Sequence, residues 1–143
     1  KDWEKAGEAF QTFLTKNLRH ELTRKVRLGL GRVQIEQDQD DDALRSLSRA
    51  VRGSDGDEVG AEAQFLRGEI YRAQEKFDEA IAEYAKVEAF KLHEPWRADA
   101  LWGQALALEG NGDAAAATDK LKELLTQFPN STAAQKAKEK LIP

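Results

Sequence analysis

Few side chains in this sequence are of the types that perform catalysis or bind metal ions. The 143 residues contain no cysteine, which excludes disulfides, thiolate nucleophiles, zinc fingers and iron–sulfur clusters. The two histidines, His20 and His93, both fall in segments that we expect to be turns between helices. A solvated imidazole is the ordinary state of such a histidine, so we expect neither to act as a general base or a metal ligand.

The acid-rich segment 38–42 has the composition of a calcium-binding loop. Such a loop needs a glycine at its sixth place and a glutamate at its twelfth, where this chain has Arg49. Carboxylates are also stabilised in the first turn of a helix, by the helix dipole. The segment therefore predicts a helix start and not a metal site.

Two glycine-containing segments also have simpler explanations than a ligand site. Gly29-Leu30-Gly31 has neither a third glycine nor a preceding strand, so it is not a dinucleotide-binding fingerprint. The segment from Gly110 to Asp113 is most simply a turn between helices. Because no cluster of residues suggests an active site, we expect a protein that is not an enzyme and needs no cofactor or metal ion.

Composition limits the class of protein further. The chain has 22 Lys and Arg against 26 Asp and Glu, a net charge of −4 at pH 7, which argues against a nucleic acid as partner. Hydrophobic residues make up 41% and charged residues 34%, a polar but globular mixture for one domain. No stretch approaches the roughly 20 apolar residues of a membrane-spanning helix. Because there is no methionine, we expect the chain to be a piece of a longer protein.

An internal repeat organises the chain, and its marker is an alanine that recurs at intervals of 37 residues. A bulky residue follows each alanine by four positions, which places both on one helical face. The alanines are Ala6, Ala43, Ala80 and Ala117, and the bulky residues are Phe10, Leu47, Tyr84 and Leu121. In three units a small residue also stands 12 positions before the alanine, at Gly31, Gly68 and Ala105. It marks a second, preceding helix in each of these units.

The repeat predicts pairs of antiparallel helices. They approach closely where a Gly or Ala faces an Ala, and the bulky residue fills the space beside that contact. Each pair leaves an apolar face open, so the pairs must stack, and we expect an all-α, right-handed α–α solenoid. Its units are a half repeat at 1–16, full repeats at 22–53, 57–90 and 95–128, and a closing helix at 132–141.

One segment conflicts with a helical interpretation, because its apolar residues nearly alternate, as in a strand. These residues are Val26, Leu28, Leu30, Val33 and Ile35. In addition, Gly29 and Gly31 each cost a helix about 1 kcal/mol relative to alanine. The repeat register nevertheless predicts a helix from Leu22 to Ile35.

The repeated residues resemble the tetratricopeptide repeat, whose pattern runs from a Trp or Leu through Leu-Gly, Tyr, Ala and Phe to Pro. The third unit matches this pattern at Leu101, Ala105, Leu108, Ala117, Leu121 and Pro129. It departs at Gln104, which stands in the place of the Leu, and the period of 37 exceeds the usual unit of about 34. The resemblance covers nearly the whole chain and implies the fold without implying a particular function.

The last stretch is similar to the C-terminal repeats of two families of bacterial envelope proteins, the Tol-Pal-associated cell-division coordinator and the outer-membrane assembly lipoprotein. The similarity rests on the segment from Phe128 to Leu141, a Pro-x-Ser turn followed by an Ala- and Lys-rich helix. It implies a periplasmic scaffold in a Gram-negative bacterium. Many other bacterial repeat proteins share this ending, so a cytoplasmic location stays open.

Binding is the chemistry that the repeat favours, because the first helices of such a stack line a concave surface. Leu28, Phe65 and Trp102 are spaced by 37 and would form an apolar row bordered by charges, which is what a peptide-binding surface needs. The alternative is that the two aromatic residues pack neighbouring helices. The predicted partner-binding residues are Lys25, Leu28, Arg32, Ile35, Phe65, Glu69, Arg72, Trp102, Leu106 and Glu109.

Charge gives the predicted surface a polarity. The third unit contributes Asp99 and Glu109, whereas the first unit is basic and suits an acidic segment. The basic residues are Arg19, Arg24, Lys25, Arg27 and Arg32. A solvated amphipathic helix explains the same charges, and RNA binding would need a basic groove along its whole length.

The N-terminal helix has its own expectation. The chain begins at the second helix of a pair, so Trp3, Ala6 and Phe10 would lack part of their cover. We expect this terminal face to meet an upstream repeat, another copy of the chain or a partner.

These observations predict a non-catalytic scaffold that binds a protein or peptide segment in a concave groove. They predict no nucleic-acid partner and no insertion into a membrane. The alternative is a structural spacer or self-association module of a larger envelope protein, in which the groove is idle and the ends make the contacts.

Overall fold

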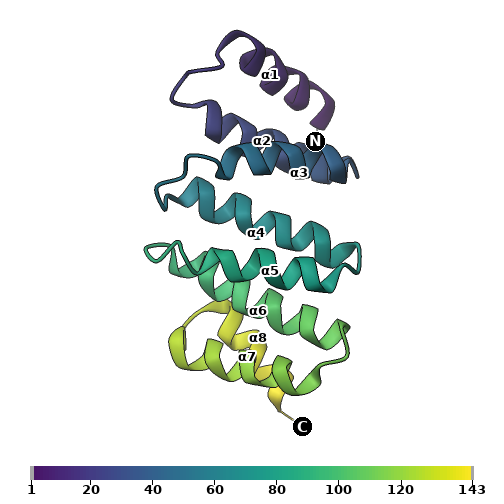
Figure 1. Cartoon of the computed structure of the whole chain (residues 1–143), viewed down its shortest axis with the longest axis vertical. Helices are drawn as coiled ribbons and strands as arrows, with labels where there is room; N and C mark the ends of the chain where they lie inside the picture. The colour runs from purple at the N-terminus through teal and green to yellow at the C-terminus, as the bar shows by residue number, and fades with distance from the viewer. Residues whose placement is uncertain (1, 143) are drawn as a thin grey trace.

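The computed structural model describes residues 2–142, which form eight helices and no strand. The helices are α1 (Trp3–Lys16), α2 (Thr23–Glu36), α3 (Asp40–Val51), α4 (Glu58–Ala73), α5 (Phe77–Val87), α6 (Glu94–Gly110), α7 (Ala114–Gln127) and α8 (Thr132–Leu141). They stack along the long axis of the molecule, with the two chain ends at opposite ends of the stack (Figure 1). The expected all-α fold is confirmed.

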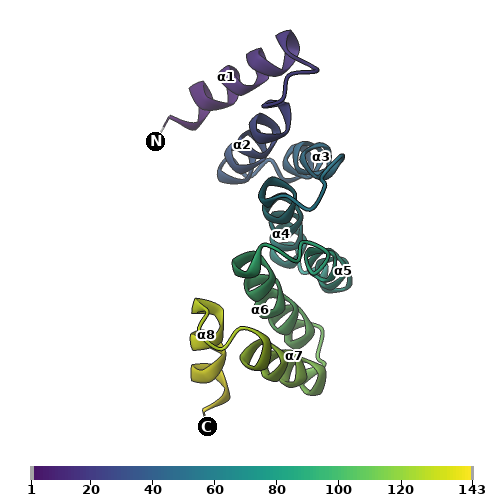
Figure 2. The same cartoon turned by 90° about the vertical axis from the view of Figure 1, so that its left-hand side faces the viewer.

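The helices form an open solenoid. The pairs α2–α3, α4–α5 and α6–α7 pack closely, and the second helix of each pair also packs on the helix that follows it. In the described chain, no helix touches another more than two places away in the order. Figure 2 shows α2, α4, α6 and α8 along one side, which we call the inner face, and α3, α5 and α7 along the other, the outer face.

The segment with strand-like alternation is helical, as the repeat register predicts. Both of its glycines have a packing role that offsets their low helix propensity. A Cβ atom on Gly29 would lie 2.9 Å from Cζ of Phe10, and one on Gly31 would lie 2.7 Å from Cδ2 of Leu47. Because only a bare backbone admits the neighbouring side chain so closely, α2 keeps these glycines.

The repeated alanines are core residues, and the glycines of the preceding helices accommodate the bulky residues that follow these alanines. Ala43 and Ala80 are fully buried, and Ala117 is 5% exposed. The nearest atoms to a Cβ on Gly68 belong to Tyr84, one turn beyond Ala80, with Cε1 at 2.5 Å. This glycine therefore makes room for the bulky residue. A Cβ on Gly31 would lie near Leu47 and also 3.7 Å from the Ala43 carbonyl oxygen.

Residue sizes are matched between consecutive units. Tyr84 is fully buried, and its ring also abuts Gly103 of the next unit, where a Cβ would lie 2.5 Å from its Cζ. Phe10 meets Gly29 in the equivalent way. Where the bulky residue is Leu47, the next unit has Leu66 at the corresponding position, packed against the same core cluster. An aromatic ring thus stands opposite glycine, and leucine opposite leucine.

The turns inside the three full units share one backbone conformation. Asp38, Glu75 and Gly112 follow the first helices at intervals of 37 and all have positive φ, at 57°, 57° and 86°. This left-handed conformation ends a helix and favours glycine. The turn geometry is therefore repeated although only one of the three residues is a glycine.

A polar cluster joins the first and second units. Asp57 is the N-cap of α4 and accepts a hydrogen bond from the Gly60 backbone N–H at 2.8 Å. Its carboxylate is also paired with Arg24 of α2, whose Nε donates to the Ala50 carbonyl oxygen at 2.8 Å. The Arg24 guanidinium lowers the pKa of Asp57 from 3.8 to about 2, with further help from the Gly60 N–H and Ser54. One arginine thus ties together α2, the end of α3 and the start of α4.

The Asp57→Asn variant is expected to lose stability that depends on pH. A folded-state pKa below the unfolded value stabilises the fold fully above about pH 4, and this contribution is lost as the pH falls toward about 2. Asparagine caps a helix as well as aspartate does, so the substitution isolates the charge. Because the Asp57 side chain is 45% exposed, we expect a loss of no more than about 1 kcal/mol at neutral pH.

Urea unfolding at a series of pH values between neutral and about pH 2 measures this difference. The stability of the original chain should fall more steeply below about pH 4 than that of Asp57→Asn, so the two curves should converge. Parallel curves would contradict the role given to the Arg24–Asp57 pair.

Candidate functional site

The inner face is a continuous wall of helices. α2 touches α4, α4 touches α6 and α6 touches α8, so these four helices lie side by side along it (Figure 2). It is the surface to which the predicted partner-binding residues were assigned by register.

Of the three residues in the predicted apolar row, Phe65 and Trp102 are half-buried and Leu28 is buried. Phe65 packs against Tyr84 and Trp96, with ring centroids 5.8 Å and 5.5 Å away. Trp102 packs against the core cluster that α6, α7 and α8 share. Leu28 is only 6% exposed and lies in the core with Leu47. Only Phe65 and Trp102 are therefore accessible to a partner. Both also pack against neighbouring helices, which is the alternative role that the sequence analysis left open.

The predicted set has two further apolar residues, Ile35 of α2 and Leu106 of α6. Ile35 and Leu106 are half-buried, and Ile35 packs against the core cluster around Leu28. Lys25 is exposed at the start of α2.

Most charged residues of the predicted set are already paired within the chain. Arg32 of α2 donates from Nε to buried Glu62 of α4 at 2.6 Å. Glu109 of α6 forms an ion pair with Lys140 of α8 at 2.8 Å. These pairs link neighbouring first helices across the inner face. A partner that covers them does not have to supply their counter-charges.

A third internal pair lies on α4 and reaches into the core. Arg72 and Glu69 are 2.9 Å apart, and the Tyr84 hydroxyl donates a hydrogen bond to the same Glu69 carboxylate. Burial, together with the negative charge of Glu69, raises the pKa of Tyr84 far above its usual value, so the phenol stays protonated. The pKa of Arg72 is also raised, chiefly by its hydrogen bond to Glu69. These two predicted binding residues thus hold Tyr84 in place.

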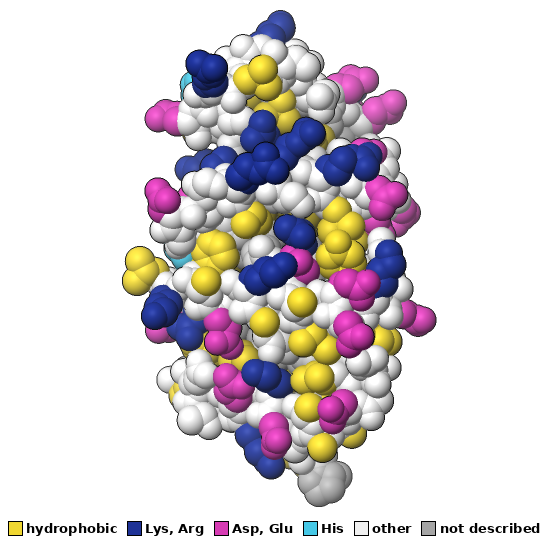
Figure 3. Space-filling view, in the orientation of Figure 1, with side chains coloured by type: hydrophobic (Ala, Val, Ile, Leu, Met, Phe, Trp, Pro, Cys, Tyr) yellow, Lys and Arg dark blue, Asp and Glu magenta, His cyan; other side chains and the backbone are white. Residues whose placement is uncertain are grey.

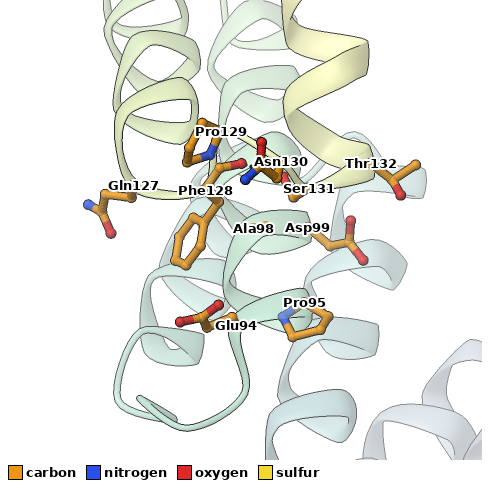
Figure 4. Close-up of a pocket in the computed structure, with 10 residues that line it drawn as sticks. All are labelled: Glu94, Pro95, Ala98, Asp99, Gln127, Phe128, Pro129, Asn130, Ser131 and Thr132. Atoms are coloured by element: carbon orange, nitrogen blue, oxygen red, sulfur yellow. Dashed lines mark hydrogen bonds between the residues drawn. The ribbon is translucent and has the colours of Figure 1, made fainter.

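A cavity of about 440 Å³ lies where the start of α6 meets the turn between α7 and α8 (Figure 4). Pro95, Phe128 and Pro129 supply apolar walls, and the carboxylates of Glu94 and Asp99 border it. Burial raises the pKa of Asp99, and the charge of Lys136 on α8 acts in the opposite direction, although Asp99 forms no ion pair among the described residues. An unpaired, half-buried carboxylate beside apolar walls suits a cationic side chain.

Sequence reasoning placed Asp99 on the inner face but missed this cavity. The only signals were Pro95 and the segment 128–131, which stand at the two ends of the predicted repeat 95–128. Pro95 does lie in the first turn of α6, and Ser131 caps α8 by accepting from the Ala134 N–H at 3.0 Å.

The N-terminal face is partly covered by the chain itself. Trp3, Ala6 and Phe10 are all half-buried, and the Phe10 ring rests on Gly29 of α2. The three side chains therefore keep part of their surface exposed, and the partner that would cover it stays a prediction.

The histidines take part in turns. The His20 ring accepts a hydrogen bond from the Leu22 backbone N–H through Nδ1 at 3.1 Å. Nε2 of His93 lies 3.0 Å from the Gly56 carbonyl oxygen. Across residues 2–142 no His, Cys, Asp and Glu side chains gather into a group that could hold a metal ion.

In the same range, none of the helices has the length and apolar character that crossing a bilayer requires.

Comparison with known proteins adds family and fold. Residues 1–96 match the tetratricopeptide repeat-like domain family, and residues 99–131 match a second tetratricopeptide repeat family. No curated protein matches the chain. Neither family description specifies a cell compartment, so the envelope location implied by the resemblance stays a prediction.

Two solved structures share the fold. The crystal structure of MamA protein has a TM-score of 0.75 and 24% identity, over 87% of this chain and 63% of that one. A tetratricopeptide repeat protein from Parabacteroides merdae has a TM-score of 0.78 and 18% identity, over 95% of this chain and 51% of that one. This chain thus spans 63% of the length of the first protein and 51% of the length of the second.

Proposed function

The chain belongs to the tetratricopeptide repeat-like domain family, a protein-interaction repeat fold that is generally non-catalytic, and from this premise we propose that its inner face binds a segment of a partner protein. The segment is extended or helical, it lies across α4 and α6, and its capture involves no chemical step and no cofactor.

The state of the inner-face side chains is the observation on which this proposal rests. Phe65 and Trp102 are rigidly packed on one side and half exposed on the other. Anchored aromatic residues are frequent hot spots of binding energy because little conformational entropy is lost when they are covered. The neighbouring charges are paired internally, so covering them leaves few charges without a partner.

The cavity at the start of α6 indicates what else the segment contains. Asp99 and Glu94 favour a lysine or arginine whose stem packs on Pro95 and Phe128. The proposed partner segment therefore combines apolar side chains for Phe65 and Trp102 with a cationic residue toward the α7–α8 turn.

Trp102→Ala is expected to weaken binding of such a segment at least about tenfold, because a truncated aromatic hot spot costs more than 1.4 kcal/mol. The probe is a synthetic peptide obtained by selecting a random peptide library on the immobilised chain, and its affinity is measured by calorimetry. Leu92→Ala is the matched control, since Leu92 is 88% exposed, lies in the α5–α6 turn and is not among the predicted binding residues.

Circular dichroism at the temperature of the assay checks that both variants stay folded. Equal affinities for Trp102→Ala and Leu92→Ala would overturn the proposal. So would sedimentation data in which the chain alone forms a dimer that Trp102→Ala abolishes, since the inner face would then serve self-association.

A further inference from the structure

A second hollow lies on the outer face, away from the surface proposed above. It has a volume of about 220 Å³ and lies between α1 and α3, with α2 as its floor. Leu14, Leu18 and Leu30 give it an apolar side, and Arg27 and Arg49 border it with guanidinium groups. Figure 3 shows Lys and Arg side chains gathered at this level of the molecule.

The charge around this hollow is opposite to that of the whole chain. Together with two shallower hollows that adjoin it, it is lined by six cations and by one carboxylate, that of Asp42, whereas the net charge of the chain is −4. The cations are Lys16, Arg19, Arg27, Arg45, Arg49 and Arg52. Among the described residues, only Arg45 of these forms an ion pair, with Asp42.

The second unit shows what occupies the equivalent place. Glu83 of α5 is 5% exposed and accepts a hydrogen bond from Gln64 Nε2 at 2.5 Å. Arg67 Nε lies 3.0 Å from the same carboxylate, and Lys86 Nζ donates to its other oxygen at 2.6 Å. One internal carboxylate thus accepts hydrogen bonds from Gln64 of α4 and Lys86 of α5, and it forms an ion pair with Arg67.

In the first unit two of these three donors have cationic equivalents, Leu30 stands for Arg67, and the carboxylate is missing. Counting back 37 residues, Arg27 stands for Gln64 and Arg49 for Lys86, but Ser46 stands for Glu83. Ser46 donates to Gln34 Oε1 at 2.7 Å, which leaves the Gln34 amide N–H groups without a described acceptor. The hollow is therefore rich in hydrogen-bond donors, and the one carboxylate that lines it, that of Asp42, is already paired with Arg45.

The fold does not require cations at these positions. The residues 37 and 74 positions after Arg27 are Gln64 and Leu101, and those after Arg45 are Ala82 and Asp119. The later units fold in the same way with neutral or acidic residues at these two places, although Lys86 keeps a cation at the place of Arg49, so packing does not account for Arg27 and Arg45.

We propose that this hollow binds an acidic segment of a partner protein, with one Asp or Glu side chain entering the place that Glu83 fills in the second unit. Its carboxylate accepts from Arg27, Arg49 and the Gln34 amide, and an apolar neighbour covers exposed Leu18. Charge-assisted bonds of this kind are about twice as strong as neutral ones. Leucine side chains beside the guanidinium groups fit a peptide better than a nucleic-acid backbone or a lipid surface.

The test uses a short fluorescein-labelled peptide of alternating glutamate and leucine, with binding followed by anisotropy at low ionic strength. Replacing both Arg27 and Arg49 by Gln should weaken binding at least about tenfold, since hydrogen bonds to charged groups contribute about 1.5–3 kcal/mol each. The control, Lys91→Gln with Lys122→Gln, removes the same charge from exposed positions elsewhere and should bind nearly as well as the original chain.

A second variant tests the geometry independently of charge removal around the hollow. Ser46→Glu restores the internal carboxylate of the second unit and should exclude the peptide, again by at least about tenfold. Ser46→Gln is its matched control, because it has the same size without the charge, and it should bind more tightly than Ser46→Glu.

The proposal is overturned if the double arginine variant and the double lysine variant bind alike, or if a peptide with glutamine in place of glutamate binds as well as the probe. It is also overturned if single-stranded RNA or vesicles of anionic lipid displace the probe more effectively than unlabelled peptide does, when the competitors are compared at equal concentration of negative charges. Since Trp102 lies on the opposite face, either proposal can fail without the other.

Discussion

Tyr84→Ala should lower the free energy of unfolding by about 3–5 kcal/mol, the usual range for truncating a buried aromatic side chain. Tyr84 is the largest fully buried side chain in the described chain. Its ring fills the space left by Gly68 of its own unit and Gly103 of the next, and it packs against Phe65. Because no side chain lines these glycines, the cavity left by the substitution cannot collapse easily.

The place of Tyr84 in the stack adds a qualitative expectation. A solenoid is stabilised by contacts between consecutive elements, and Tyr84 lies where α5 meets α6. Loss of its ring should therefore uncouple α6–α8 from the preceding helices, and the unfolding transition should broaden or separate into two steps.

Urea unfolding followed by circular dichroism measures both effects. Leu92→Ala is the control and should change stability by less than about 0.5 kcal/mol, because its side chain is 88% exposed. Tyr84→Phe separates the ring from the hydroxyl and should cost about 0.5–1.5 kcal/mol, since Glu69 keeps its bond to Arg72. A loss for Tyr84→Ala no larger than that for Tyr84→Phe would contradict the importance given to the ring.

The period of the pattern was sufficient to predict the fold. A constant interval of 37 between small residues on one helical face predicts helix pairs, and it predicts a helix for α2 although the local alternation suggests a strand. The glycines in α2 look unfavourable only when the helix is considered alone. Phe10 and Leu47, which come from other helices, provide the reason for keeping them.

The surface was less predictable because exposure depends on neighbours that the register does not specify. Leu28 and Phe65 share a register position, yet Leu28 is buried and Phe65 is half exposed. Arg32 and Glu62 are 30 residues apart, so their pairing follows from the stacking of α2 on α4 and not from a local motif. The turn at Glu75 has the positive φ and the backbone hydrogen bonds of the turn at Gly112, although its residue type does not indicate them.

The effect of Gly103→Ala on the free energy of unfolding should depend on the residue at position 84: destabilising with tyrosine there and stabilising with leucine. In the original chain it should destabilise by about 1–2 kcal/mol, because overpacking of the buried ring outweighs the gain in helix propensity of about 1 kcal/mol. The ring has little room to move away from the new methyl group, since it is fully buried and also abuts the backbone at Gly68. With Tyr84→Leu, the space opens and the propensity gain should dominate.

The chain itself contains the precedent for this compensation, since Leu47 and Leu66 occupy the two equivalent positions one unit earlier. A double-mutant cycle by urea unfolding should therefore give a coupling energy of about 2–3 kcal/mol between positions 84 and 103. Gly7→Ala is the matched control. Its Cβ would lie at an ordinary 3.4 Å from Val33 Cγ1, so it should stabilise α1 by up to about 1 kcal/mol whatever stands at position 84. Additive effects of Gly103→Ala and Tyr84→Leu would show that the size match between consecutive units does not determine how tightly they stack.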